Sequence, residues 1–416
     1  VGGAITPAIN CSVGYLGGVP YLGRDFNGDG GMLDTIRFHT PSETNRRRYG
    51  LISSLRYDVS EGHTVRIAYS LDYARHRQTG EIGRLALNGQ PEYDAVFPEA
   101  AAGGGIKDAT GSVLQKRDRF SKAILHQVSG EYRGEFGPLT ANVGVRAPFF
   151  KRDLTNYCAT SSATGFVECF GTNSAGAAQY ATLNPTIQGP QRRVLNYSKV
   201  LPNVGLVYDF SPAASIFGNY SQGLQVPGTD NLYNSFFFPA NTPSANPVPE
   251  KTDNFDLGFR YRTSKLQVQG SVWYTIYNNR LASAYDPETD RTLYRNLGRV
   301  DKYGVDGSVS YRPIPEVSLY AFGSYLKSKI KDNVLYGECT AVSAATGCTS
   351  IGQAIYAQTA GRRESGAPVY TLGGRAQANL GFIELGIQAK RTGARYVNDL
   401  NAPFTVGGTI VGGRGG

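Results

Sequence analysis

Oxygen-bearing side chains recur at every second position in the stretch DFNGDG, as they do in the first half of an EF-hand calcium loop. The residues concerned are Asp25, Asn27 and Asp29, followed a few positions later by Asp34. The twelfth position counted from Asp25 is Ile36, where an EF-hand needs a bidentate Glu, and no helical pattern flanks the segment. An EF-hand is therefore excluded. Two interpretations remain: a weak calcium site in an exposed loop, or a turn rich in Asp, Asn and Gly, which we favour.

The cysteines fall into two close pairs and one remainder. Cys158 and Cys169 lie in one predicted connection, and Cys339 and Cys348 lie in another. No His accompanies either pair, so we prefer two local disulfides in an oxidising compartment to a metal site. Cys11 is left over, and we expect its partner in a part of the protein that precedes this chain.

A third group of candidate residues is aromatic. The stretch NSFFFPA and the tyrosine just before it place four rings in one predicted connection: Tyr233, Phe236, Phe237 and Phe238. They predict either a hydrophobic platform for a ligand or the packing of a large loop against itself, and the second is the more common case.

Two basic stretches, TNRRRYG and LQKRDRF, lie where predicted strands should reach the rim of a sheet. Their cations are Arg46, Arg47, Arg48, Lys116, Arg117 and Arg119. Such cations pair with the phosphates of lipopolysaccharide, attract an anionic ligand, or remain solvated; the last is the most common. We count the first three as candidate ligand contacts.

Signatures of enzymes are absent from the sequence. There is no phosphate-binding loop, no His-Glu-x-x-His and no Gly-x-Ser-x-Gly, and only four His are available for acid–base work. The net charge of +9 is spread along the chain rather than clustered among aromatic residues, which argues against nucleic-acid binding. We expect no enzyme and no cofactor other than a loop calcium ion.

The elements that position these residues are predicted to be strands, since apolar and polar residues alternate with period two. In TVRIAYSLDY, FDLGFRYR and IELGIQAK every second residue is apolar and the others are polar or small. The predicted strands are 45–59, 64–78, 117–135, 139–153, 194–210, 214–224, 251–262, 266–281, 293–312, 316–332, 363–380 and 383–399. Most exceed the ~5–6 residues of strands in globular sheets and the ~9–11 that cross a bilayer.

The connections alternate between short turns, such as DVSEGH and FGPLT, and long segments near 79–116, 154–193, 225–250, 282–292 and 333–362. This alternation is typical of an antiparallel up-and-down transmembrane β-barrel with periplasmic turns and extracellular loops. Aromatic residues beside the short turns fit an interfacial girdle: Tyr208, Phe210, Tyr261 and Tyr311. Residues 1–44 are expected to be an extracellular loop, 45–399 the strands, and 400–416 a truncated loop. We therefore interpret the chain as about 12 strands from the middle of a larger barrel.

Three blocks of sequence resemble the TonB-dependent outer-membrane receptors. They are LPNVGLVYDFSPAASIFGNYSQGLQVPGTDNLY (201–233), PVPEKTDNFDLGFRY (247–261) and YRNLGRVDKYGVDGSVSYRP (294–313). They occur in the family's order and at the spacing of barrel hairpins. The family's plug domain, its TonB box, its first strands and its last strands with the terminal aromatic residue have no counterpart here.

The resemblance implies a 22-stranded barrel with a plugged lumen, in the outer membrane of a Gram-negative bacterium. It implies active uptake of a scarce nutrient, a ferric siderophore or an oligosaccharide, energised through the plug by TonB and its inner-membrane complex. Lumen-facing side chains are then expected to contact the plug or to form a hydrated wall: Arg66, Asp72, Asp256, Arg260 and Gln269.

Two other functions remain open from the sequence alone. One is a passive pore or a structural barrel of the outer membrane. The other is a secreted all-β calcium-binding adhesin or hydrolase, which would require the apolar strand faces to pack against a second sheet.

Overall fold

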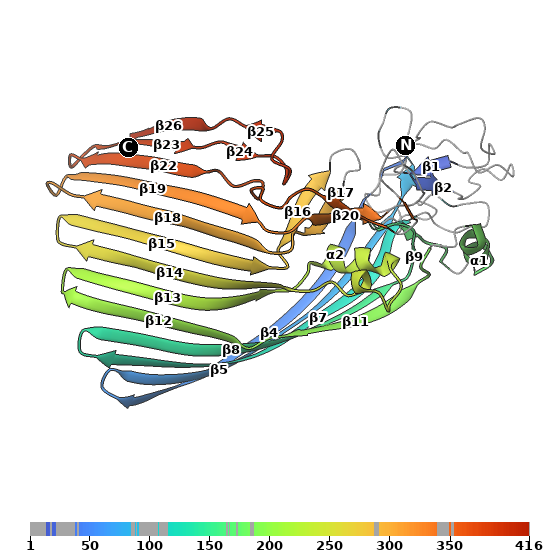
Figure 1. Cartoon of the computed structure of the whole chain (residues 1–416), viewed down its shortest axis with the longest axis horizontal. Coiled ribbons are helices and arrows are strands. Elements are labelled where there is room, and N and C mark those ends of the chain that lie inside the picture. Colours follow the sequence, from blue (N-terminus) through green and yellow to red (C-terminus); the bar gives the residue numbers. More distant parts are fainter. Residues whose placement is uncertain are drawn as a thin grey trace.

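A computed structural model describes residues 14–16, 19–21, 38–39, 41–84, 88, 90, 107, 115–163, 165, 167–171, 174–183, 187–286, 291–338, 349–350 and 353–415. One large antiparallel sheet of 14 strands dominates it (Figure 1). Strands that follow one another along the chain lie side by side, so the predicted antiparallel up-and-down topology is confirmed. The strands at the two edges of this curved sheet are β4 and β26.

The strands of the main sheet are mostly longer than a bilayer requires. They are β4 (Glu43–Ser60), β5 (His63–Glu81), β7 (Gln115–Phe136), β8 (Leu139–Asn156), β11 (Gln191–Ser198), β12 (Leu201–Ser211), β13 (Ala214–Gln225), β14 (Glu250–Arg262), β15 (Leu266–Asn278), β18 (Val300–Tyr311), β19 (Val317–Ile330), β22 (Tyr370–Asn379), β23 (Glu384–Thr392) and β26 (Gly408–Gly415).

Short turns join the strands at one end of the sheet, and the long connections gather at the other, which we call the outer rim (Figure 1). Glu61 and Gly62 turn β4 into β5, and Gly137 turns β7 into β8. Both glycines have positive φ, 75° and 62°, a conformation that side chains with a Cβ rarely adopt in such tight turns.

The long connections carry small elements of their own. The hairpins are β1 (Gly14–Leu16) with β2 (Val19–Tyr21), β3 (Phe38–His39) with β6 (Gly83–Arg84), β9 (Ala159–Thr160) with β10 (Val167–Glu168), β16 (Leu281–Asp286) with β17 (Arg291–Asn296), β20 (Val334–Glu338) with β21 (Ala354–Ala357), and β24 (Arg395–Tyr396) with β25 (Phe404–Thr405). The helices are α1 (Ser174–Leu183) and α2 (Thr229–Asn234), with 3-10 turns at Ser235–Phe237 and Pro243–Ala245. None of the helices in these described segments has the length and apolar character needed to cross a membrane.

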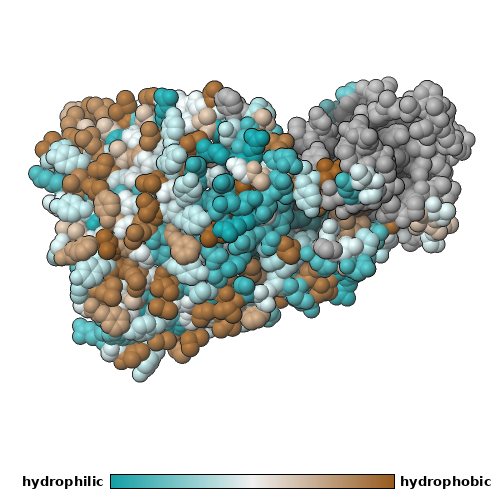
Figure 2. All heavy atoms as spheres, in the orientation of Figure 1, coloured by the Kyte–Doolittle hydropathy of each residue, from teal (hydrophilic) through white to brown (hydrophobic). Residues whose placement is uncertain are grey.

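The main sheet has one apolar and one polar face. Leu257, Val272 and Val305 occupy one rung across β14, β15 and β18, and each is 50–58 % exposed. Figure 2 shows such apolar residues in bands over the part of the sheet away from the outer rim, with hydrophilic residues collected near α2. Within the described residues no second sheet packs on the apolar face, so the packing that the secreted-protein alternative requires is not found there.

Aromatic side chains border this apolar face in two rows. Tyr220, Phe255, Tyr274 and Tyr303 share one rung of β13, β14, β15 and β18 toward the outer rim; we call them the outer aromatic row. The predicted girdle residues lie near the short turns: Tyr208, Phe210, Tyr261 and Tyr311. Along β18, Tyr303 and Tyr311 are about 27 Å apart, or about 21 Å in height at a typical strand tilt, close to the ~25 Å apolar band of transmembrane barrels.

The polar face carries the side chains that were predicted to point into a lumen. Asp256 lies opposite Trp273, and Arg260 lies opposite Gln269, on the side away from Leu257. The indole of Trp273 donates a hydrogen bond of 2.7 Å to Asp306, and the Arg260 guanidinium lies 4.3 Å from the ring centre of Phe217.

Two predicted strands are each divided in the structure. The segment 194–210 forms β11 and β12, which pair with β8 in one register but are interrupted at 199–200, opposite Ala147 and Pro148. Pro148 has no N–H to donate, which removes a ladder bond at this point. The segment 293–312 forms β17 and β18, separated by Gly298 with φ 64°, and the expected long connection 282–292 belongs to the β16–β17 hairpin.

The C-terminal prediction needs three corrections. The predicted strand 363–380 begins only at Tyr370, and 383–399 ends in the main sheet at Thr392. Residues 400–416 were expected to be a loop, but they contain β25 and β26, and β26 extends the sheet beside β23. Its sequence GTIVGGRG combines a β-branched run, Thr409 to Val411, with four glycines, and it pairs along the backbone edge that β23 offers.

Candidate functional site

The long connection between β13 and β14 folds back over the polar face at the outer rim. This connection, called loop 226–249, contains α2 and both 3-10 turns. It buries Leu232 and Phe236 completely against Leu154 and Leu195 of the strands. Alternation in β11 explains the contact, because the side chains on its polar face are buried while their neighbours are exposed.

Arg193, whose side chain lies on the polar face of β11, anchors loop 226–249 to the sheet. Its Nη1 donates hydrogen bonds to the carbonyl oxygens of Ser235 (3.0 Å) and Ala245 (3.2 Å), and its Nη2 to that of Phe238 (2.6 Å). The guanidinium carbon lies 4.8 Å from the ring centre of Phe236. Burial lowers the pKa of Arg193, and the three carbonyls and the ring replace part of the hydration that the cation gives up.

Tyr233 joins the loop to two strands. Its hydroxyl lies 2.9 Å from the carbonyl oxygen of Phe120 and 3.2 Å from that of Thr155, and burial raises its pKa. The Arg119 guanidinium lies 4.5 Å from its ring centre and pairs with Asp230 at the start of α2. These contacts fasten the loop to β7 and β8.

The predicted aromatic platform is therefore wrong for two of its four members. Tyr233 and Phe236 are 4 % and 0 % exposed and pack within the loop and its supporting strands, which is the self-packing alternative. Phe237 and Phe238 are half-buried, with ring centres 5.4 Å apart in an edge-to-face arrangement. Their contact with a ligand stays a prediction.

Strand alternation also divides the run of three arginines. Arg46 and Arg48 lie on the polar face, whereas Arg47 lies on the same face as Tyr49 and Tyr73. Arg48 forms a bidentate pair with Asp72, with Nε to Oδ1 at 2.8 Å. Arg47 therefore cannot line the same surface as its two neighbours, which corrects the prediction that all three contact one ligand.

A cationic cluster forms on the polar face around His76. Arg46 lies directly opposite His76 on β4, while Arg117 and Arg119 come from β7. Burial lowers the pKa of His76, and the positive charges of Arg46, Arg119 and Arg117 lower it further, whereas Asp230 opposes them. Three arginines against one carboxylate create a positive potential at this rim, which favours anionic ligands.

A separate buried ion network holds the connections beyond β14, β15 and β19. Arg280 pairs with Glu250 (3.0 Å) and Glu364 (3.0 Å), and the Lys302 Nζ lies 2.6 Å from Glu364. Burial lowers the pKa of Arg280, but Glu364 and Glu250 outweigh it and raise the pKa. Because both carboxylates of this network already face cations, the network is structural rather than a free site.

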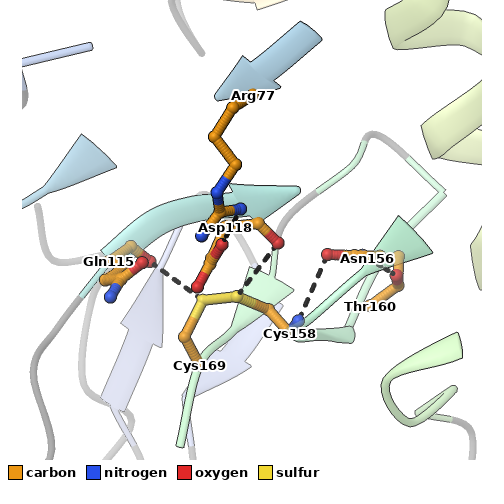
Figure 3. Close-up of a disulfide and its surroundings, with 7 residues drawn as sticks. All are labelled: Arg77, Gln115, Asp118, Asn156, Cys158, Thr160 and Cys169. Carbon is orange, nitrogen blue, oxygen red and sulfur yellow. Dashed lines mark hydrogen bonds and ion pairs between the residues drawn. A yellow bond between two sulfur atoms is a disulfide. The ribbon is translucent and has the colours of Figure 1, made fainter. Parts of the chain in front are cut away.

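The predicted disulfide between Cys158 and Cys169 is present, with a Cα–Cα distance of 4.3 Å (Figure 3). Both residues are buried. The backbone N–H of Cys158 donates to Asn156 Oδ1 (3.2 Å), and the ion pair of Arg77 with Asp118 lies beside the bridge. The bridge therefore ties together two parts of the connection that follows β8, next to the start of β7.

The other metal and cysteine predictions lie outside the described residues. They concern Cys11, Asp25, Asn27, Asp29, Asp34, Cys339 and Cys348. Within the described segments no group of three His, Cys, Asp or Glu side chains is arranged to hold a metal ion. A loop calcium site and the second disulfide stay predictions.

The sequence-based prediction missed Arg193 and the network around Arg280. The stretch QRRVLNY holds the signal for Arg193, since its alternation places Arg193 with Leu195 and Tyr197 on one face. No such signal exists for Arg280, because its partners come from strands and connections distant in sequence.

Comparison with known proteins shows one family. The family model described as "TonB dependent receptor-like, beta-barrel" matches residues 12–412. The rhizobactin receptor of Rhizobium meliloti (strain 1021) is 20 % identical over 215 residues, which are 46 % of this chain and 25 % of that protein.

Solved structures share the fold. The siderophore receptor PiuA from Acinetobacter baumannii matches with a TM-score of 0.58 and 15 % identity, over 91 % of this chain and 50 % of its own. The ferric yersiniabactin uptake receptor FyuA from Yersinia pestis matches with a TM-score of 0.56 and 13 % identity, over 90 % of this chain and 47 % of its own. The chain thus spans about half the length of these structures.

Proposed function

The chain belongs to the TonB-dependent receptor-like β-barrel family, and on that premise we propose that it acts in the uptake of an anionic nutrient chelate across the outer membrane of a Gram-negative bacterium. The observation that carries this proposal is the division of one sheet into two faces. An exposed apolar face between two aromatic rows suits lipid, and a cationic cluster at the outer rim of the other face suits an anionic ligand.

The ligand class that this surface favours is a ferric siderophore. Among the similar proteins, PiuA from Acinetobacter baumannii is named a siderophore receptor. An anionic chelate would bind more tightly because of the positive charge of Arg46 and its neighbours around His76, whereas the same charge would strengthen the binding of a neutral oligosaccharide little. Phe237 and Phe238 add half-buried aromatic surface near the same rim.

Energy for release would come from TonB and its inner-membrane complex, acting through a plug seated against the polar face. Asp256 and Trp273 supply charged and aromatic contacts on that face at mid-height of the sheet, and Arg260 adds a cation nearer the short turns. Uptake that persists after removal of TonB would instead favour a passive pore.

The test is uptake of radiolabelled iron by a deletion strain complemented with the full-length gene, supplied with a panel of ferric siderophores. We expect uptake of one or more chelates to be lost on deletion and restored by the wild-type gene. The Arg46→Gln variant should raise the apparent KM about fivefold, the scale of losing one contact to an anion. Arg312→Gln, which removes the same charge at the short-turn end, serves as the matched control.

Two results would count against the proposal. One is unchanged uptake of every ferric chelate after deletion, combined with a growth defect on an oligosaccharide. That result would identify an oligosaccharide, not a ferric siderophore, as the imported ligand. The other is an equal effect of Arg46→Gln and Arg312→Gln on the apparent KM of uptake, which would show that the cationic cluster does not take part in ligand recognition.

A further inference from the structure

A second group of cations lies on the apolar side of the sheet, where an import ligand would not pass. Arg47 of β4 lies opposite Arg75 of β5, and Arg75 lies opposite Lys122 of β7, so three cations share one rung. The next rung toward the outer rim holds Arg77 opposite Phe120. Alternation places all five side chains on the face of the apolar band.

This arrangement costs stability unless an anion neutralises it, because like charges directly opposite each other on neighbouring strands repel. In the part of the chain that the structure describes, neither Arg47 nor Arg75 forms an ion pair with an acidic side chain. Two nearby carboxylates are already engaged. Asp118 pairs with Arg77, and Asp153, which lies opposite Lys122 at the β8 end of the same rung, is held by Arg192.

Four of these five residues, all but Lys122, line a space for a ligand group. A surface groove of about 320 Å³ is lined by Asn45, Arg47, Arg75, Arg77 and Phe120. The Arg75 guanidinium lies 5.3 Å from the ring centre of Phe120, and the Lys122 Nζ lies 5.9 Å from it. One aromatic wall and several cations form a site suited to a phosphate carried on an apolar body.

The height of the groove relative to the apolar band identifies the source of that phosphate. Arg47 and Arg75 are the next residues on this face beyond Tyr49 and Tyr73, which lie opposite each other at the outer edge of the band. Cations just beyond an aromatic row lie at the level of lipid headgroups. Headgroups of the outer leaflet of a Gram-negative outer membrane are the phosphorylated sugars of lipid A.

We infer that the groove between β4, β5 and β7 binds a phosphate of lipid A, with Arg47, Arg75 and Lys122 as its cationic ligands. The inference rests on the membrane placement in the proposed function. The groove belongs to the lipid-facing side, so its ligand is distinct from the imported chelate, which meets the polar face.

The test uses the full-length natural protein in detergent and measures its dissociation constant for bis-phosphorylated lipid A by native mass spectrometry. The test variant is Arg47→Gln/Arg75→Gln/Lys122→Gln. Each cation near an anionic lipid surface contributes about fivefold, so we expect roughly 100-fold weaker binding for the three. The matched control is Arg262→Gln/Lys265→Gln/Arg312→Gln, which removes three cations beside the short turns and should leave the constant unchanged.

A second ligand and a second readout keep the test decisive. Dephosphorylated lipid A should bind the wild type as weakly as bis-phosphorylated lipid A binds the test variant. Without lipid A, the test variant should melt at the wild-type temperature or above, because the opposed cations no longer repel. If it does not fold, Arg75→Gln alone should weaken binding about fivefold.

The inference is overturned if the test variant binds bis-phosphorylated lipid A within threefold of the wild type, or if dephosphorylated lipid A binds the wild type equally well. Either result, obtained with a protein that fractionates with the outer membrane and supports iron uptake, refutes the lipid A site alone. A protein that does not fractionate there refutes the proposed function instead.

Discussion

Arg193 provides the sharpest test of how loop 226–249 is held at the outer rim. Replacing Arg193 with Met keeps much of the side-chain length and removes every donor. The carbonyl oxygens of Ser235, Phe238 and Ala245 then lose a charged partner beneath the loop. We expect the loop to open locally while the strands persist, because the register of the sheet does not depend on this contact.

The magnitude follows from the number of acceptors. Each hydrogen bond contributes about 1 kcal/mol net, so the three together contribute about 3 kcal/mol to the free energy of loop opening. That difference corresponds to roughly 150-fold faster exchange of loop amides in the regime where the equilibrium constant for local opening sets the exchange rate. The informative amides are those of Leu232 and Phe238, which donate to the carbonyls of Gly228 and Ser235 inside the loop.

The assay is hydrogen exchange with mass spectrometry on the detergent-solubilised protein. Arg192→Met is the matched control: the same substitution one residue earlier, on the opposite face, where Arg192 is 63 % exposed and pairs with Asp153. Arg192 lies on the face away from the loop, so loss of its pair with the buried Asp153 should change exchange of the loop amides less than about fivefold. Equal effects of the two substitutions, or unchanged exchange at Phe238 in Arg193→Met, would refute the anchoring role.

Three further outcomes are expected. Cys158→Ser, which leaves Cys169 as a free thiol, should remove about 3 kcal/mol of ordering from the segment between them; limited proteolysis that cuts variant and wild type at equal rates would contradict this. Glu250→Gln should destabilise the network by about 1–3 kcal/mol, less than a fully broken buried pair because Arg280 keeps a second carboxylate, and a melting temperature equal to that of the wild type would contradict it. Because the pKa of His76 is lowered from 6.5, the unfolded chain binds this proton at a higher pH than the folded chain, so the contribution of His76 to stability is constant above about pH 6.5 and falls below it. Melting temperatures of His76→Gln should therefore lack the decrease that the wild type shows as the pH falls. If the variant keeps the full decrease, another group causes it.

The separation of the two faces of the sheet could be predicted from residue types alone. Side chains alternate in a strand, so Leu257 and Phe259 necessarily share one face and Asp256 and Arg260 the other. The same rule identifies Arg47 as separate from Arg46, although the run of three arginines invites a single role.

The sequence alone could not show which residues form the loop core and which remain free for a ligand. Phe236 and Phe237 are identical and adjacent, yet Phe236 is fully buried and Phe237 is half-buried. Their difference depends on Arg193 and Leu195, which are distant in sequence and meet the loop only once β11 extends along β8.

What the sequence determined by itself was the period and the order of the strands, and hence an up-and-down sheet with one apolar face, because these depend on neighbours along the chain. The disulfide between Cys158 and Cys169 belongs to the same class, since a short separation allows few other partners. The tertiary structure alone decided that β26 joins the edge of β23, that three cations share one rung, and that Glu250, Arg280 and Glu364 meet. Each of these depends on the register between strands, and a pairing energy between distant segments leaves no local pattern in the sequence.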